Sequence, residues 1–114
     1  KQCFMSLGFD SQPLDKKYSN VKYLWCRSEY PTEYNRMKEI PKSFDDTIYY
    51  GISDHSIGIE ASLVCVARGA KLVEKHVTYN KMGSSNSNFD HVCSITFDEL
   101  ADLVKYSKLM NKIV

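Results

Sequence analysis

Histidines follow two apolar segments of this chain closely, and both sit among other polar residues. Residues 47–50 lead through Ser53 and Asp54 to His55, and residues 70–74 lead to His76. Two neutral imidazoles from neighbouring strands, with further positions open to water and substrate, suit a catalytic divalent metal ion. Spacing alone leaves a second interpretation open, in which both histidines are hydrogen-bonded residues on the rim of a sheet.

The segments that carry these groups have the pattern of short buried strands. Each is four to six residues long, rich in apolar or aromatic residues, and bounded by turn formers or charges. They are residues 4–7, 21–26, 47–50 and 70–74. The second of them also runs into a polar group, residues 27–31, so three of these segments end in chemistry-bearing residues.

Helical patterns lie between or after the strands. Residues 57–68 carry apolar side chains at helical spacing, and Gly69 follows as a C-terminal stop. Residues 96–99, Thr-Phe-Asp-Glu, predict a capping box that opens a further helix. A weaker helix is expected over residues 33–40, and the polar segment 14–20 has room for one turn.

Strands that alternate with helices predict an α/β fold with a parallel sheet and crossover connections. A closed eight-stranded α/β barrel needs about 250 residues, and this chain has 114. We therefore expect a partial (β/α)8 TIM barrel, with about four parallel strands and crossover helices. The active site of such barrels lies at the C-terminal ends of the strands, where His55 and His76 could approach each other.

The composition argues against several other classes of protein. The 15 Lys+Arg and 14 Asp+Glu give a net charge of +1, so the basic excess of a nucleic-acid binder is missing. No apolar run approaches the roughly 18 residues of a membrane span, and no GxGxxG follows the first strand. The four cysteines form no C-x-x-C pair, and we expect them to be reduced in a cytoplasmic protein.

Several motifs, in the same order along the chain, resemble the sialic acid synthase family. Residues 51–60, GISDHSIGIE, and residues 66–78, VARGAKLVEKHVT, look like that family's segments. Residues 26–32, CRSEYPT, resemble its C-T-S-x-Y-P-T segment, and residues 90–100 resemble its D-H-x-x-S-x-x-x-x-E-L segment. The resemblance runs from about Val21 to the end of the chain and corresponds to the C-terminal half of the family's TIM barrel.

The resemblance implies a carbon–carbon bond-forming synthase. Such enzymes condense phosphoenolpyruvate with N-acetylmannosamine, its 6-phosphate or a related amino sugar, and release inorganic phosphate with the help of Mn²⁺ or Mg²⁺. Matching positions give the metal ligands His55 and His76, the substrate-binding residues Ser28, Tyr30 and Ser53, and the catalytic carboxylates Glu74 and Asp90.

Most of these residues also have a structural interpretation. Ser53 could cap the helix expected near Ile57, Tyr30 could be a packing residue, and Asp90 could belong to a turn. Lys75 is more simply a rim charge. Asp54 is expected to orient a neighbour or the start of the helix rather than bind the metal.

The resemblance also shows departures from the family. Asn88 and Phe89 stand where the family usually has Gly-Pro before the Asp-His pair, and Arg27 and Glu29 replace smaller or neutral residues. The N-terminal half of the barrel and the C-terminal antifreeze-like domain have no counterpart among residues 1–114. We therefore expect an excised piece of a longer enzyme or a chain that self-associates, with very little synthase activity alone. The alternatives are a non-catalytic half-barrel module that binds a sugar or a partner subunit, and a different phosphoenolpyruvate-using barrel.

Overall fold

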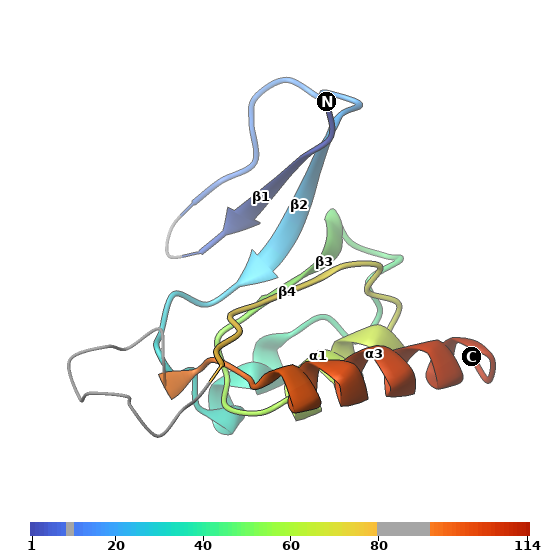
Figure 1. Cartoon of the computed structure of the whole chain (residues 1–114). Coiled ribbons are helices and arrows are strands. Elements are labelled where there is room, and N and C mark those ends of the chain that lie inside the picture. Colours follow the sequence, from blue (N-terminus) through green and yellow to red (C-terminus); the bar gives the residue numbers. More distant parts are fainter. Residues whose placement is uncertain (9–10, 80–91) are drawn as a thin grey trace.

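A four-stranded parallel sheet forms the centre of the protein in a computed structural model that describes residues 1–8, 11–79 and 92–114 (Figure 1). The strands are β1 (Cys3–Leu7), β2 (Val21–Cys26), β3 (Tyr49–Asp54) and β4 (Val73–Lys75). They lie side by side in sequence order, and each neighbouring pair is parallel. The predicted fold class is confirmed, because the four strands curl as half of a barrel.

Helices cover one face of this sheet. They are the 3-10 helix η1 (Tyr34–Glu39) and the α-helices α1 (Glu60–Ala67) and α3 (Phe97–Asn111). The helices α1 and α3 pack against each other beneath β3 and β4, while β1 and β2 extend away from them (Figure 1). Within the described residues, no helix is long and apolar enough to cross a membrane.

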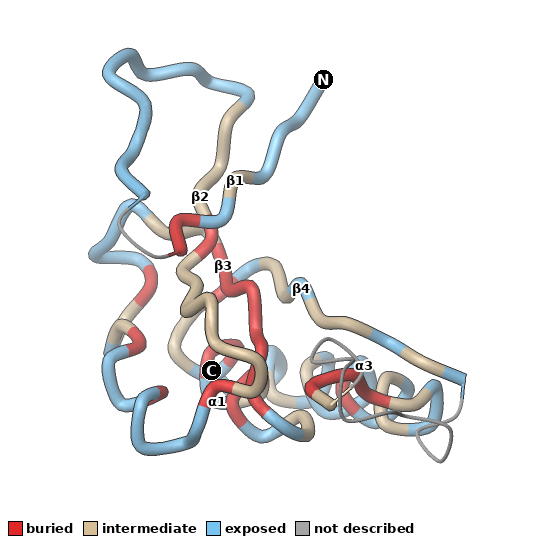
Figure 2. Tube along the Cα trace, turned by 90° about the vertical axis from the view of Figure 1, so that its left-hand side faces the viewer, coloured by how far each residue is buried: buried red, intermediate tan, exposed pale blue. Residues whose placement is uncertain are grey.

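The hydrophobic core lies between β3 and the helices. Its buried members are Met37, Ile40, Phe44, Ile52, Ala61, Cys65 and Ala70. Trp25, Tyr49 and Val73 pack against this cluster from the sheet. Buried residues concentrate in β3 and α1, whereas residues 11–20, which precede β2, are exposed (Figure 2).

Side chains alternate between the two faces of the sheet, and the strand register aligns them into rows. The row that faces the helices contains Trp25, Ile52 and Val73. The next row, on the opposite face, contains Cys26, Ser53 and Glu74. The polar residues therefore lie on the face that would become the interior of a closed barrel.

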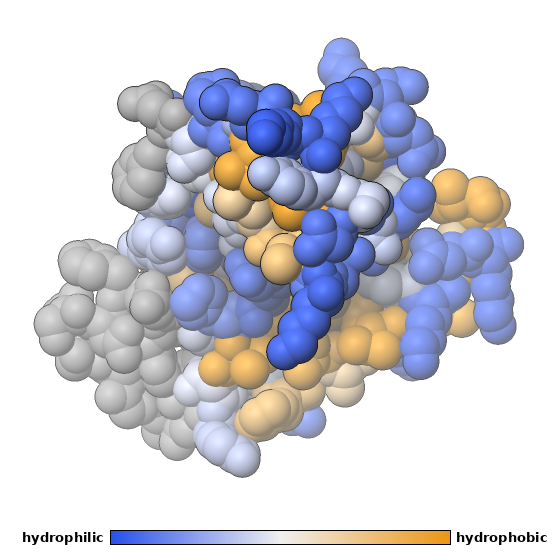
Figure 3. Space-filling model, turned by 90° about the horizontal axis from the view of Figure 1, so that it is seen from above, coloured by the Kyte–Doolittle hydropathy of each residue, from blue (hydrophilic) through white to orange (hydrophobic). Residues whose placement is uncertain are grey.

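Apolar side chains reach the surface on the part of the molecule that a closed barrel would cover. Phe4 on β1 is 46% exposed, and its ring lies 6.0 Å from the ring of Tyr50. Apolar groups appear between hydrophilic ones on the face seen from above (Figure 3). The surface of the described half-barrel is thus partly apolar.

The third strand extends four residues beyond its predicted end at Tyr50. Gly51 continues the strand instead of ending it. The chain at Gly51 passes so close to residue 72 that a Cβ there would lie 2.0 Å from the Leu72 carbonyl oxygen. Only glycine permits this approach. As a result, Ser53 and Asp54 lie inside β3 and obey its alternation instead of following the strand.

Other element boundaries also differ from the predictions. Helix α1 begins at Glu60 instead of Ile57, because Gly58 has a φ of 80°, outside the helical region. The expected helix over residues 33–40 is the shorter 3-10 helix η1. The described segment 11–20 forms no helix and contains one hydrogen-bonded turn at its end, where the Val21 amide donates to the Tyr18 carbonyl at 3.2 Å; β4 begins at Val73 instead of Ala70.

The predicted capping box at the start of α3 is confirmed. The Thr96 hydroxyl accepts a hydrogen bond from the Glu99 amide at 3.2 Å, and the Glu99 carboxylate accepts one from the Thr96 amide at 3.0 Å. The amides of the N-cap residue Thr96 and of Glu99 in the first turn are thereby satisfied.

We expect Thr96→Ala to lower the free energy of unfolding by about 1 kcal/mol, since it removes the side-chain acceptor of the cap. Urea denaturation followed by circular dichroism measures the loss. Thr96→Ser keeps the hydroxyl and should stay close to the original stability. Equal losses in the two variants would contradict a capping role.

Cys65 should be protected from alkylation while the protein is folded. Burial raises the pKa of its thiol to about 12, so the reactive thiolate is scarce at pH 8. Iodoacetamide at pH 8, followed by mass spectrometry, should modify the exposed Cys3 and leave Cys65 unmodified until urea is added. Rapid modification of both in the native protein would show that this part of the core opens readily.

Candidate active site

The two histidines come together at the C-terminal ends of β3 and β4. His55 follows Asp54, the last residue of β3, and His76 follows Lys75, the last residue of β4. Alternation continues past the strand ends, so both rings lie on the same side as Glu74. Their ring centroids are 5.5 Å apart.

His55 is held in one orientation by its neighbours. Its Nδ1 lies 3.0 Å from the Arg27 carbonyl oxygen. A carbonyl can only accept, so in the neutral imidazole Nδ1 carries the proton and Nε2 the lone pair. The Tyr30 ring packs against the imidazole with centroids 4.4 Å apart, and His55 is only 6% exposed.

Ser53 and Glu74 form a direct pair across the strands. The Ser53 hydroxyl donates to Glu74 Oε1 at 2.6 Å, and Ser53 is buried. The interpretation of Ser53 as a helix cap is therefore wrong, because the residue lies within β3 and its hydroxyl is directed to β4. To donate to a phosphate oxygen, the Ser53 hydroxyl would first have to give up its hydrogen bond to Glu74.

Ser28 and Cys26 extend this row toward β1. Burial raises the pKa of the Cys26 thiol, while hydrogen bonding to Ser53 and Ser28 acts in the opposite direction. The Cys26 Sγ also lies 3.7 Å from His55 Nδ1. Ser28 reaches the end of β1, where a Cβ at Gly8 would lie 2.2 Å from the Ser28 hydroxyl. The structure thus places Ser28, Ser53 and Glu74 along one polar surface.

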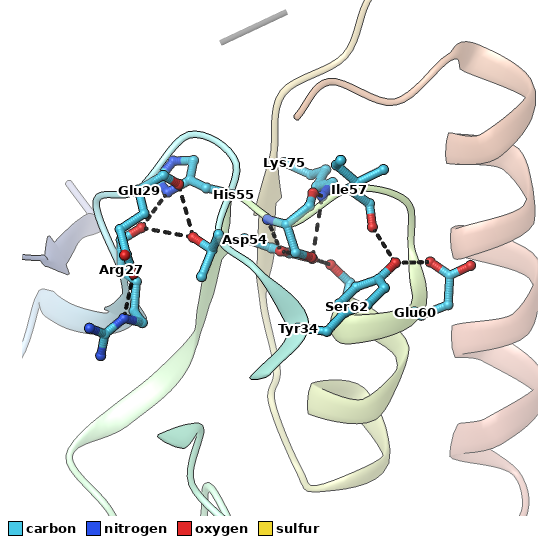
Figure 4. Close-up of polar contacts among 11 residues, drawn as sticks. Arg27, Glu29, Tyr34, Asp54, His55, Ile57, Glu60, Ser62 and Lys75 are labelled. Carbon is cyan, nitrogen blue, oxygen red and sulfur yellow. Dashed lines mark hydrogen bonds and ion pairs between the residues drawn. The ribbon is translucent and has the colours of Figure 1, made fainter. Parts of the chain in front are cut away.

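A buried polar cluster lies on the other side of the strand ends (Figure 4). Asp54 is fully buried and accepts from the Ser56 amide at 2.8 Å, the Ser56 hydroxyl at 2.6 Å and the Ser62 hydroxyl at 2.5 Å. Lys75 Nζ lies 3.5 Å from Asp54 Oδ2. Asp54 was predicted to orient a neighbour or the start of the helix, and these contacts show that it does both.

Lys75 is not the rim charge that the sequence suggested. Its side chain is only 2% exposed, and it donates to the Ser56 carbonyl as well as pairing with Asp54. The error came from ending the fourth strand at Glu74. Extending the strand by one residue would have placed Lys75 on the face opposite Glu74, beneath the helices.

Charged residues brace the loop that follows β2. Arg27 Nε lies 2.8 Å from Glu29 Oε1, and the Arg27 guanidinium also pairs with Glu39 of η1. The hydrogen bond from Arg27 holds the pKa of the Glu29 carboxyl below its usual range. These contacts tie the loop that carries Ser28 and Tyr30 to η1.

The histidine pair fits an open metal site better than a closed one. Among the residues that the structure describes, no three His, Cys, Asp or Glu side chains are grouped to hold an ion. Two neutral imidazoles with remaining positions for water and substrate suit a hydrated divalent ion. Asp90, which was predicted to act beside them, lies outside the described residues.

Comparison with known proteins places the chain in one protein family. The sequence model of the NeuB family matches residues 11–114. The N-acetylneuraminate-9-phosphate synthase of Homo sapiens is 36% identical over 98 residues, which make up 82% of this chain and 26% of that protein. The N,N'-diacetyllegionaminic acid synthase of Campylobacter jejuni is 35% identical over 99 residues, covering 84% of this chain and 29% of that protein.

A solved structure shares the fold. The N-acetylneuraminic acid synthetase of Leptospira borgpetersenii, determined in complex with citrate, superposes with a TM-score of 0.68 at 33% identity. The alignment covers 83% of this chain and 33% of that one, so the chain spans about a third or less of the length of these proteins. The four-stranded sheet is accordingly part of a TIM barrel, and the chain belongs to the NeuB family of sialic acid synthase-like proteins.

Proposed function

We propose that residues 1–114 are the C-terminal half of the barrel of a nonulosonic acid synthase and carry its metal-binding histidines and part of its substrate pocket. The enzyme would condense phosphoenolpyruvate with N-acetylmannosamine or a related amino sugar and release phosphate in the cytoplasm. The observation that carries this proposal is the 5.5 Å approach of the His55 and His76 rings on the face that holds the Ser53–Glu74 pair. The names of the two relatives, which denote synthases of different sugar acids, support the reaction class.

The histidines would hold Mn²⁺ or Mg²⁺. The Arg27 carbonyl fixes the proton of His55 on Nδ1, which leaves Nε2 as the ligand atom. Tyr30 restricts the rotation of this ring by packing on it. A divalent ion held there supplies the polarisation of the open-chain sugar's aldehyde oxygen.

Ser53 and Glu74 would contact the substrates directly. The Glu74 carboxylate faces the open side of the half-barrel and already accepts one hydrogen bond. It can therefore hold a sugar hydroxyl, or accept its proton. Asp90 is proposed for a similar role on the basis of the resemblance alone.

The charge of phosphoenolpyruvate requires groups from the rest of the barrel. Glu74 adds negative charge to this face, and the adjacent Lys75 points to the other face, where it pairs with Asp54. Bringing a phosphate and a carboxylate next to Glu74 is unfavourable without nearby cations. The other half of the barrel, or a second copy of the chain, would supply these cations.

A non-catalytic role is the second candidate. It is favoured by the Arg27–Glu29 ion pair in the loop after β2, where the family has smaller or neutral residues, and by Asn88-Phe89 in place of the family's Gly-Pro. Such a module would bind a sugar or a partner subunit through the same polar surface. The two proposals differ in whether the histidines and Glu74 support turnover once the barrel is complete.

The histidine pair should bind Mn²⁺ in the chain as it stands. Titration followed by electron paramagnetic resonance should give a dissociation constant that rises by about tenfold or more in His55→Ala and in His76→Ala, since loss of even an outer-shell contact costs about 10–100-fold. Asp46→Asn removes an exposed carboxylate away from the site and should leave the affinity unchanged. Equal Mn²⁺ affinity in the original chain, the two histidine variants and Asp46→Asn would contradict the proposed metal site.

Turnover can be tested in a completed barrel. The segment of the Leptospira borgpetersenii synthetase that aligns with this chain is replaced by residues 1–114, and phosphate release is measured with phosphoenolpyruvate and N-acetylmannosamine. Glu74→Gln should lower kcat by about 10²–10⁴-fold, the range of general acid–base catalysis. Lys42→Met, at an exposed position, should not change it.

The result decides between the two candidates. A folded chimera that binds Mn²⁺ and sugar but releases no phosphate would favour the non-catalytic module. Full turnover in Glu74→Gln would remove Glu74 from the catalytic residues.

A further inference from the structure

We propose that Lys75 is a positioning residue that fixes the separation of His55 and His76 from the far side of the sheet. The functional part of this inference rests on the metal role proposed above. The structural part does not, because it concerns the distance between two rings. Neither the resemblance nor the comparisons assign a role to this lysine.

The ammonium group of Lys75 contacts the chain on both sides of His55. It lies 3.5 Å from the carboxylate of Asp54, the residue before His55, and donates to the carbonyl of Ser56, the residue after it. The backbone of Lys75 leads directly to His76. One side chain therefore joins the two segments that carry the histidines (Figure 4).

The backbones of the two histidines are otherwise tethered in opposite directions. The His55 carbonyl accepts from the Thr32 amide at 2.9 Å, toward the β2 side. The His76 carbonyl accepts from the Ile95 amide at 2.8 Å, on the side away from β3. The ladder between β3 and β4 ends at Asp54 and Lys75, one residue before the histidines. Lys75 spans the space between these two tethers.

The anchor of Lys75 is itself fixed. Asp54 Oδ1 accepts from the amide and hydroxyl of Ser56, while Oδ2 accepts from Ser62 in α1 and faces Lys75. Both carboxylate oxygens are thus committed, so the carboxylate has little freedom to rotate. Asp54 therefore fixes the position of Lys75 relative to the helix layer.

Stability alone gives no reason for a buried pair here. Taking both charges out of water is costly, and apolar residues of similar volume often replace a buried ion pair without loss of stability. An apolar pair would fill the space but could not bind the Ser56 carbonyl. The pair is therefore explained better by the geometry it imposes on the strand ends.

The test uses the double variant Asp54→Asn/Lys75→Met, which removes both charges together and leaves no unpaired ion. Lys75 borders a cavity of about 630 Å³ between β4 and α3, so a methionine has room. We expect the melting temperature to change by less than about 8 °C, equivalent to about 1 kcal/mol. The Mn²⁺ dissociation constant should rise by about tenfold or more. If the pair only stabilised the fold, the Mn²⁺ affinity would not fall while the melting temperature stayed nearly unchanged.

Ring-to-ring nuclear Overhauser effects provide a readout that needs no metal. The contact between His55 and His76 should weaken or vanish in the double variant. The Tyr30–His55 contact, with centroids 4.4 Å apart, should persist because Arg27 and Thr32 hold that side independently. The control Lys42→Met/Asp46→Asn makes the same chemical changes at exposed positions and should preserve both contacts and the affinity.

The outcomes separate this inference from the proposed function. If the original protein binds no Mn²⁺, the metal proposal fails, while the ring contacts still decide the role of Lys75. An unchanged His55–His76 contact in the folded double variant would overturn the inference. Should that variant not fold, Ser62→Ala, which keeps both charges but frees Asp54 from α1, must weaken the same contact. An unchanged contact there would overturn the inference as well.

Discussion

The direct pairing of β3 with β4 places consecutive polar residues on opposite faces of the sheet. Ser53 lies opposite Glu74 on the open face, and Asp54 lies opposite Lys75 beneath the helices. Because neighbouring residues of a strand point in opposite directions, His55 and His76 return to the open face. The chemistry-bearing groups and the groups that hold them are thus interleaved along the same two strands.

This interleaving makes the helix layer part of the site. Asp54 receives a hydrogen bond from Ser62 in α1, so the end of β3 is fixed to the helix that follows it. The Tyr34 hydroxyl of η1 donates to the Ile57 carbonyl at 2.7 Å and steadies the same connection (Figure 4). Packing on the helix-covered side of the sheet therefore controls where the histidines point. The helix residues that make these contacts do not themselves lie on the open face.

The open face also explains the mixed character of the surface. In a closed barrel, strand side chains fill the interior in layers. Here Phe4 is 46% exposed and the Glu74 carboxylate faces outward, because this chain provides four strands of the barrel. On this face Glu74 is exposed, whereas Ser53 and His55 are buried.

Local patterns in the sequence were enough for the class of fold, the capping box at Thr96 and the grouping of His55 with His76. These features depend on residue type, short spacing and the rule that parallel strands end at one edge. The role of Lys75 was not readable in this way, since a lysine next to a glutamate looks the same whether it is solvated or buried. Tertiary packing decided it: the close approach of Gly51 to the Leu72 carbonyl continued β3 to Asp54, and the register with β4 then brought Lys75 and Asp54 together beneath the helices, where both side chains are buried.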